Sequence, residues 1–493
     1  MKTTVAVISD VHFDPSNAAS GSARRGAIAD ILFLRAVHRL NRMIRPDLTL
    51  LLGDLVNRGE SPEAPADLAR IRAIAGLIES PVIAIPGNHD GDPDAFYSAF
   101  ERPAPFCDVH GIRFVPFVDP EEPGYNARRT PRDIERMAQA RAGFAGPIVA
   151  VHHAPLFPPG AADCPYNYTN ADDVIDAMRA HGISLAIGAH YHAGMAPVYD
   201  EGVAFIAAPA LCESPFRFLE IVLDGDDMQV HTHALRMPDE LALVDTHVHT
   251  HLAYCSENMS IPAAMALAQD FGLAGCVFTE HSGHLYFDKE TYWAGRFLPD
   301  GVDYAGPGRR CRMDEYLDAL AAAGCPPENA ALEVDCDFRG RPVIRPADRG
   351  RFRYLTGAIH QLDALNAPRP GIDAVAAEFM ASLDTFIRSG IRVLAHPFRV
   401  FRRAGLEPPA TLFGPVARLL RDSAVAAEIN FHTNEPPPRF VRLCIDLGVG
   451  LTLGSDAHNL YEVGEFAPHL ALLKACGYDG PLGDILVDPR HAG

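Results

Sequence analysis

The feature that most constrains this chain is a series of short apolar runs, each ending in histidine, aspartate or asparagine. In the first half these runs are TVAVISD, LTLLLGD, PVIAIPGN, PIVAVHH and SLAIGAH, and amphipathic segments such as 27–43 lie between several of them. Such runs predict buried strands, and layered α/β folds keep their active residues at the carboxyl ends of parallel strands. We therefore expect a layered α/β domain whose polar side chains gather at one edge.

The same alternation begins again after residue 243, with seven strand-like runs. They are LALVDTHVHT, AGCVFTEHS, NAALEVDCD, RYLTGAIHQ, IRVLAHPF, VAAEIN and VGLTLGSDAH. Just before them, GVAFIAAPAL and FRFLEIVLDGDDMQVHTHAL predict antiparallel strands with a turn at DGDD. Seven strands alternating with helices predict a parallel barrel with its chemistry at the carboxyl mouth. Since 493 residues exceed one hydrophobic core, we expect two domains, 1–236 and 243–493.

Composition restricts the compartment and the partners. No run approaches the ~18 apolar residues of a membrane span, and the start MKTTVAVISD reads as a strand rather than a secretory signal. Ten cysteines lie scattered without CxxC pairs, which favours reduced thiols in a cytoplasmic protein without membrane partners. The formal net charge of −20 disfavours long nucleic acids, whose binding needs a basic face. Small phosphorylated molecules remain open as substrates, and the oligomeric state stays unknown.

The strand ends of the first half carry oxygen and imidazole donors without thiolate, a set that suits Mn, Fe or Zn. One such histidine alone is more often structural, but five motifs in order at successive strand ends indicate a site. A carboxylate at Asp54 could bridge two cations ~3.5–4 Å apart, as in two-metal hydrolases. The candidates are Asp10 and His12 in SDVHFD, Asp54 in LLGD, Asn88 and His89 in PGNHD, His152 and His153 in VHHAP, and His190 and His192 in GAHYH.

This order resembles the calcineurin-like metallophosphoesterase family, whose motifs are DxH, GD, GNH, a histidine pair and GHxH. The resemblance covers residues 1–235 and implies a four-layer αββα sandwich with two metals, each Mn, Fe or Zn. It implies that Asp10, His12, Asp54 and His192 hold one metal, and that Asp54, Asn88, His152 and His190 hold the other. His89 becomes a general acid or hydrogen-bond donor beside the leaving group, and Asn88 and His153 contact substrate. The chain departs from the family in GAHYH, which is one residue longer than GHxH, and in HHAP, where either histidine could be the ligand; we assign His152.

A second set of donors follows the strand-like runs of the second half. So many buried imidazoles and carboxylates tolerate one another only around cations, because unpaired buried charge is costly. The set is His247 and His249 in DTHVH, Glu280 and His281 in FTEHSG, Glu333 in LEVDCD, His360 in GAIHQ, His396 in LAHPF, and Asp456 and His458 in GSDAH.

This second pattern resembles the PHP (polymerase and histidinol phosphatase) family over residues 243–480. The resemblance implies a distorted (β/α)7 barrel and phosphate ester hydrolysis with two to three metals, each Zn, Mn or Fe. His247, His249, Glu333 and Asp456 would hold one metal, Glu333, His360 and His396 a second, and His281 and His458 a third, completed by Glu257. Arg399 in HPFR could clamp a substrate phosphate or could pair with a carboxylate at the surface.

These expectations combine into a cytoplasmic, bifunctional metal-dependent phosphoesterase with two hydrolytic sites. Asp54 and Asp456 are the central catalytic carboxylates, and water activated by the cations cleaves small phosphodiesters, phosphomonoesters or both, with nucleotides and sugar phosphates among the candidates. One domain could open a diester and the other remove the exposed phosphate. The alternatives are a nuclease, which should show a basic groove, and a protein in which one domain is a silent ligand sensor or assembly module.

Overall fold

The chain forms two compact units, Met1–Arg236 and Met237–Gly493, each of which has its own sheets and core. The computed structural model describes residues 2–16, 23–225, 227–306 and 311–491. In the described residues, no helix has the length and apolar character needed to cross a membrane.

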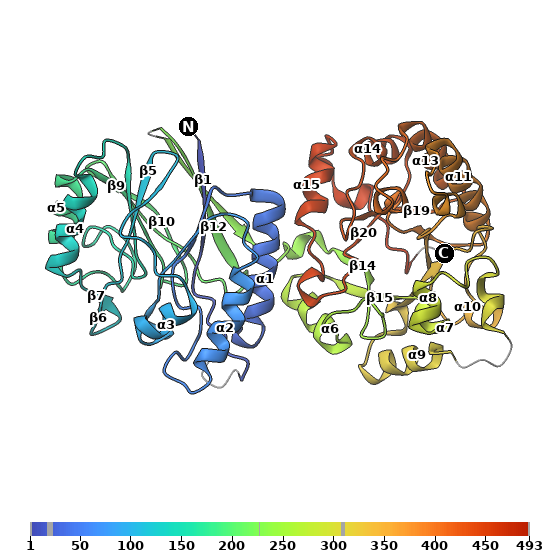
Figure 1. Ribbon diagram of the computed structural model, residues 1–493, viewed down its shortest axis with the longest axis horizontal. Coiled ribbons are helices and arrows are strands. Elements are labelled where there is room, and N and C mark those ends of the chain that lie inside the picture. Colours follow the sequence, from blue (N-terminus) through green and yellow to red (C-terminus); the bar gives the residue numbers. More distant parts are fainter. Residues whose placement is uncertain (1, 17–22, 226, 307–310, 492–493) are drawn as a thin grey trace. The chain divides into compact units, whose positions relative to one another are not determined.

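The first unit contains two packed sheets (Figure 1). The first sheet has the order β13 (Asp227–Ala234), β12 (Arg217–Asp224), β1 (Thr3–Ile8), β2 (Leu48–Leu51) and β3 (Val82–Ala84). Within it, β1, β2 and β3 run parallel, and β12 and β13 add an antiparallel hairpin. In the second sheet four strands run parallel and the two edge strands are antiparallel to their neighbours. The second has β10 (Met195–Asp200), β11 (Val203–Ala207), β9 (Ile183–Gly188), β8 (Ile148–Val151), β5 (Ile112–Pro116) and β4 (Cys107–Val109), and a small ribbon joins β6 (Glu121–Glu122) to β7 (Asn126–Ala127).

Helices cover both outer faces of this sandwich, so the unit has four layers, as Figure 1 shows. The antiparallel prediction for the late strands holds for the β12–β13 hairpin, whereas β11 is antiparallel only to β10 and parallel to β9. One core lies between the sheets and includes Val7, Leu50, Val149 and Ile187. The helices are α1 (Ala29–Arg39), α2 (Ala64–Ala75) and α3 (Pro93–Ala99) on the first sheet's side and α4 (Pro131–Arg141) and α5 (Ala171–Ala180) on the second's, with the short helices η1 (Gly26–Ile28), η2 (Leu40–Ile44) and η3 (Asn88–Asp90).

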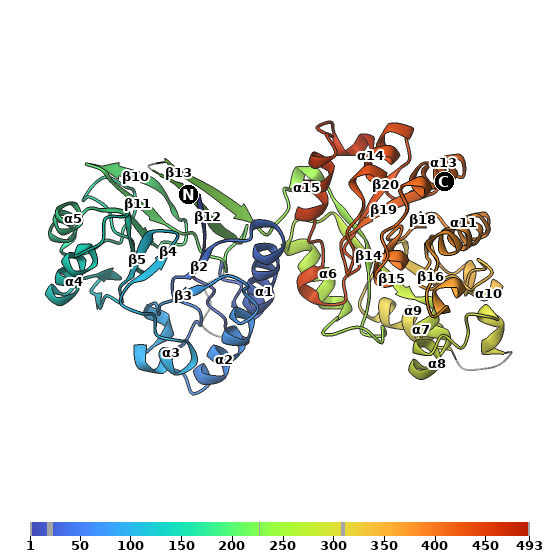
Figure 2. The ribbon, with the colours of Figure 1, turned by 45° about the horizontal axis from the view of Figure 1, so that its top comes forward.

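The second unit is built on one seven-stranded parallel sheet that follows chain order (Figure 2). The first and last strands also meet, because the Asp456 N–H donates to the His247 carbonyl and the His249 N–H to the Ala457 carbonyl. The sheet is thus a nearly closed parallel barrel with helices around it. Its strands are β14 (Val244–Val248), β15 (Gly275–His281), β16 (Ala330–Asp335), β17 (Leu355–Ala358), β18 (Val393–Leu394), β19 (Ala426–Asn430) and β20 (Leu451–Gly454).

The connections of the barrel are helical after most strands. They comprise α6 (Ile261–Asp270), α7 (Ser282–Tyr286), α8 (Lys289–Trp293), α9 (Met313–Ala322), α10 (Pro346–Arg349), α11 (Ile372–Arg388), α12 (Arg399–Arg403), α13 (Ala410–Asp422), α14 (Pro438–Leu447) and α15 (Ala467–Ala475). Short helices η4 (Asp239–Leu241), η5 (Gly301–Ala305), η6 (Pro327–Asn329), η7 (Asp363–Asn366), η8 (Leu460–Glu462) and η9 (Leu482–Asp484) complete them.

A buried ion pair fixes the segment that follows β5 in the first unit. Arg129 donates through Nε and Nη2 to the two oxygens of Asp119, at 3.1 and 2.7 Å, and the Tyr168 hydroxyl donates to the same carboxylate at 2.6 Å. Both charged side chains are almost fully buried, and the guanidinium lies over the Phe117 ring. Because Asp119 also lines a cavity with His153, this pair positions the edge of the site described below.

We expect Asp119→Asn to lower the free energy of unfolding of the first unit by about 3–5 kcal/mol, since it leaves the Arg129 charge buried without its partner. Urea unfolding followed by circular dichroism measures the effect. The matched control is Asp30→Asn, which breaks the more exposed pair with Arg70 and should cost less than about 1 kcal/mol. Equal losses in the two variants would contradict a structural role for the buried pair.

Candidate metal centres

The donors of the first unit converge at the carboxyl ends of β1, β2, β3, β8 and β9. Asp54 lies at the centre, because its Oδ2 is 3.5 Å from the His12 Nε2 and 3.4 Å from the His153 Nε2. On one side the Nε2 atoms of His12 and His192 face each other at 3.2 Å, and Asp10 Oδ1 is 3.4 Å from the latter. The potential ligand groups include Asp10 with His12 and His192, Asp54 with His153 and His190, and Asp54 with His12 and His89.

His153, rather than the predicted ligand His152, joins this cluster. Its Nε2 lies 3.2 Å from Asn88 Oδ1, and its Nδ1 donates to the Leu52 carbonyl at 2.6 Å. The His152 ring lies on the other face of the sheet, fully buried against Tyr168, with its Nδ1 on the Ala154 carbonyl. The assignment of His152 to metal is therefore corrected: successive residues of an extended segment point to opposite faces, and only His153 faces Asp54.

His89 and Asn88 follow β3 in the short helix η3 and border the cluster. The His89 N–H donates to Asp54 Oδ1 at 2.8 Å, and its ring packs edge-on against His12 at 4.7 Å. The GNHD turn is held by Asp90, which accepts from the N–H groups of Gly87 and Val56. Burial, and then the charge of Asp54, raises the pKa of Asp90 to about 7. His89 lines a cavity of about 510 Å³ beside Asp54, where a general acid is expected.

The donors of the second unit converge inside the mouth of the barrel. His247 and His249 leave β14 on the same side, with their Nε2 atoms 3.2 Å apart. Asp456 Oδ1 lies 2.9 Å from the His249 Nε2, and Glu333 Oε1 lies 2.9 Å from the His396 Nε2. The remaining predicted donors are also close: the His360 Nε2 is 3.4 Å from Glu333 Oε1, and the His281 Nδ1 is 2.5 Å from Glu333 Oε2.

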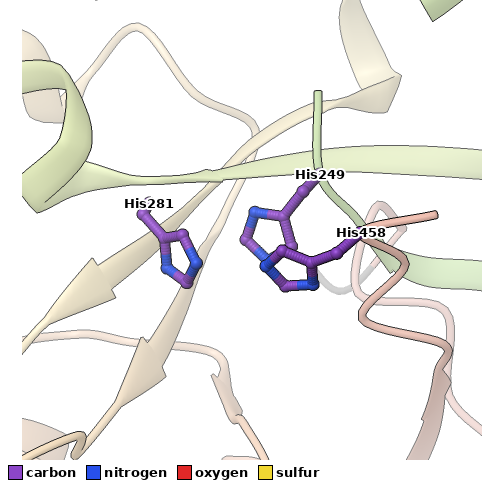
Figure 3. A group of neighbouring side chains, drawn as sticks. All are labelled: His249, His281 and His458. Atoms are coloured by element: carbon purple, nitrogen blue, oxygen red, sulfur yellow. The ribbon is translucent and has the colours of Figure 1, made fainter. Parts of the chain in front are cut away.

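A third group combines His249, His281 and His458 (Figure 3). The His249 and His458 rings lie side by side, 4.3 Å apart, and the His281 ring is 4.1 Å from that of His249. The prediction that Glu257 completes this group is corrected, because its exposed side chain accepts from Asn459 at 2.7 Å. Cys255 lies there instead, with Sγ 3.7 Å from the His281 Nε2.

Arg399 pairs with a carboxylate, which is one of the two roles that the sequence left open. It is almost fully buried, not at the surface, and it donates to Asp456 Oδ2 at 2.5 Å while its Nη2 is 3.0 Å from the His360 Nε2. It also lines the cavity at the barrel mouth. Its guanidinium therefore pairs with a carboxylate of the site and is available to an anion in the cavity.

Hydrogen-bond acceptors behind the rings decide which imidazole nitrogen carries a proton. The Nδ1 of His247 lies 2.7 Å from Glu428, that of His249 lies 3.3 Å from Glu280, and that of His360 lies 2.8 Å from Asp335. The His458 Nδ1 likewise donates to the Asp456 carbonyl, and in the first unit the His192 Nδ1 lies 2.6 Å from Glu213. Because each acceptor holds Nδ1–H, Nε2 is the nitrogen that points into the site, and it can coordinate a metal when the ring is neutral, as in metal-bound histidines.

These backing carboxylates are candidate site residues that the sequence analysis did not select. Glu428 in β19 and Asp335 at the end of β16 are acidic residues in largely apolar strands, and both are buried. A charged residue at a buried strand position is a usable signal, since it needs a partner. Gly454 accommodates Glu428: a Cβ there would lie 2.0 Å from Glu428 Oε1.

The donor sets fit divalent cations by the chemistry of their atoms. Asp10 Oδ1 and the His190 Nε2 in the first unit are buried without a hydrogen-bond partner among the described residues. In the second unit, the buried Glu333 Oε2 and His281 Nδ1 face each other at 2.5 Å. Metal coordination satisfies such atoms. Burial lowers the pKa of His153, but the charge of Asp54 raises it to about 10, whereas burial and then His249 lower the pKa of His458 to about 3.

The backbone is strained at the same positions. Asp10, His12, Asp54 and His190 in the first unit, and His396 and Asp456 in the second, have positive φ angles between 32° and 63°. L-residues adopt this region rarely, and such strain concentrates at functional sites. The tight turns after the strands therefore aim these side chains inward at a cost that the rest of the fold compensates.

Comparison with known proteins identifies one of the two units. Residues 3–194 match the family model described as calcineurin-like phosphoesterase. The N-terminal unit carries a calcineurin-like phosphoesterase domain. This match assigns metal-dependent hydrolysis of phosphate esters to that domain, and the geometry of Asp54 and its neighbours supplies donors for divalent metals.

Solved structures similar to the phosphoesterase domain share little sequence with it. A dimetal phosphatase from Danio rerio is 17% identical with a TM-score of 0.42, and the match covers 47% of this chain and 96% of that one. A purple acid phosphatase from yellow lupin (Lupinus luteus) seeds is 12% identical with a TM-score of 0.35, covering 48% and 52%. No curated protein sequence matches the chain.

The adjacent histidines of the phosphoesterase domain provide a matched pair of variants. We expect His153→Ala to weaken metal binding by more than about 10-fold, because it removes an imidazole that faces Asp54. His152→Ala should leave metal binding unchanged and lower stability by about 1–3 kcal/mol through lost packing. Metal content after dialysis, measured by plasma mass spectrometry, and urea unfolding separate the two effects. Loss of metal from the His152 variant alone would reverse our assignment.

In the barrel, we expect Glu428→Gln to weaken metal binding about 10- to 100-fold, because the amide no longer holds the His247 Nδ1–H as a carboxylate does. The control is Glu407→Gln, at an exposed side chain. Metal titration of both variants with a competing chelator gives the affinities. Indistinguishable affinities would show that Glu428 does not orient a ligand.

Proposed function

We propose that the chain is a phosphoesterase with two hydrolytic sites, one in each unit, that acts on small phosphate esters. The observation that carries the proposal is the set of imidazoles whose Nδ1 atoms are held from behind, so that their Nε2 atoms face carboxylates at the strand ends of both units. The phosphoesterase family match covers only the first site. The proposal for the second site rests on its similar arrangement of imidazoles and carboxylates.

In the first unit we assign Asp10, His12, Asp54 and His192 to one metal, and Asp54, Asn88, His153 and His190 to the other. Bound divalent cations supply positive charge beside the phosphorus and lower the pKa of a coordinated water. The protein contributes position: Asp54 sits between the two groups, and the His89 N–H holds its Oδ1. The His89 ring borders the cavity and is placed to give a proton to the leaving oxygen.

In the second unit we propose a PHP-like barrel, with His247, His249, Glu333 and Asp456 on one metal and Glu333, His360 and His396 on a second. A third metal takes His281 and His458, with Cys255 in place of the earlier candidate Glu257. The nearly closed parallel barrel and the position of every donor at its mouth support this assignment. Arg399 then fixes Asp456 and offers its guanidinium to a substrate phosphate.

The chemistry of the two sites suggests an order of action. We propose that the first unit opens a phosphodiester and that the barrel removes the phosphate thus exposed as a monoester. The net charge of −20 favours small substrates over long nucleic acids. A silent second unit is the competing account.

The test is a panel of phosphorylated metabolites, both diesters and monoesters, assayed with Mn and with Zn on the wild type, Asp54→Ala and Asp456→Ala. We expect Asp54→Ala to abolish diester cleavage, and Asp456→Ala to retain it while a monoester product accumulates. Chromatography of the products with phosphate release measures both steps. If Asp456→Ala leaves the product distribution and the bound metal unchanged, the barrel is not a second hydrolytic site.

A further inference from the structure

The cavity at the mouth of the barrel is lined by arginines and imidazoles, in contrast to the acidic composition of the whole chain. It has a volume of about 390 Å³, and none of its described lining residues is an aspartate or glutamate, although the chain carries a net charge of −20. Two arginines, Arg399 and Arg403, and five imidazoles line it. A concave surface of this composition attracts an anion.

The two arginines are placed differently. Arg399 is buried, and its Nε has no hydrogen-bond partner among the described residues. Arg403 is exposed one helical turn further along α12 and forms no ion pair with the described carboxylates. Both side chains line the cavity. An anionic group that enters it can therefore meet the exposed Arg403 guanidinium and is attracted by the charge of Arg399, whose Nη1 donates to Asp456.

An aromatic surface lines the same cavity. Trp293, the only tryptophan of the chain, ends α8 and is 49% exposed. Its ring lies 5.2 Å from that of Tyr292, which packs edge-on against His284 at 4.2 Å. The Tyr292 hydroxyl donates to Asp335 at 3.1 Å, so this surface is fixed to the carboxylate that backs His360. Trp293 is thus a half-exposed ring packed against the buried Tyr292, and such a ring suits the face of a flat ligand.

We propose that this cavity selects phosphate monoesters whose organic part carries a flat aromatic ring, nucleoside monophosphates being the chemical class that fits. The ring stacks on Trp293, and the phosphate lies toward Arg399 and Arg403. The inference deepens the proposed function and rests on it for the identity of the anion as a phosphate ester. It assigns the choice of substrate to residues outside the metal-binding set.

The test uses two probes in which CH₂ replaces the ester oxygen, so that the probe resists cleavage: the phosphonate isosteres of adenosine 5′-monophosphate and of ribose 5-phosphate. Added to the full-length protein with Mn²⁺, the adenosine probe should quench the fluorescence of Trp293 and bind about 10-fold more tightly than the ribose probe, the effect expected of one stacked base. Equal affinities of the two probes would overturn the proposal.

Variants separate the two halves of the cavity. Trp293→Leu, followed by calorimetry because the fluorophore is gone, should remove the difference between the probes, and Trp293→Phe should keep most of it. Arg403→Gln should weaken both probes by the same factor, and Arg403→Lys should restore part of the affinity. If Trp293→Leu weakens both probes equally, the ring does not stack on Trp293 and the proposal fails.

Phosphate release keeps this inference distinct from the proposed function. Selective binding of the adenosine probe without phosphate release from any monoester would remove the hydrolytic role of the barrel and leave the binding site. Equal release from adenosine monophosphate and ribose 5-phosphate, with equal binding of their isosteres, would leave the hydrolytic role and remove the selectivity.

Discussion

In each unit, two imidazole Nε2 atoms of the candidate site face each other at 3.2 Å, and the arrangement of the other site residues depends on this close approach. In the barrel, the rings of His247 and His249 each have Nδ1 beside a carboxylate, so the nitrogens that meet are the two Nε2 atoms. Carboxylates lie beside both nitrogens, with Asp456 Oδ1 2.9 Å from the His249 Nε2 and Glu333 Oε1 3.7 Å from the His247 Nε2. A proton on Nε2 stabilises this arrangement, and the multivalent cation proposed above would do so more strongly in its place.

Much of the fold could be predicted from the sequence, because the length of an apolar run and its hydrophobic period depend only on residues that are neighbours in the chain. All seven strand-like runs after residue 243 become strands of one parallel sheet, and β12 and β13 pair antiparallel as predicted. The predicted turn DGDD between them includes residue 226, which lies outside the described residues. The pairing of β11 with β9 could not be foreseen, since it depends on contacts made between strands. Within the site, the choice between His152 and His153 required knowing which face of β8 looks toward the first sheet.

The other differences between sequence and structure have a common physical cause. Glu257 follows the HxH motif closely enough to be a candidate ligand, yet the turn after His249 brings the Cys255 thiol to the His281 ring and leaves the Glu257 side chain exposed. Glu428 and Asp335 lie behind the rings, beside the Nδ1 atoms of His247 and His360. Sequence patterns identify residues at strand ends well. The residues behind them are specified by packing in three dimensions.

The closure of the barrel runs through the candidate ligands themselves. The amide of Asp456 meets the carbonyl of His247, and the amide of His249 meets that of Ala457, so the seam between the first and last strands lies at the metal-binding residues. Any interaction that brings His247, His249 and Asp456 together also stabilises the contact between the first and last strands of the barrel. An ion bound at the proposed site would therefore also stabilise the closed barrel, so that metal binding and barrel stability would be coupled.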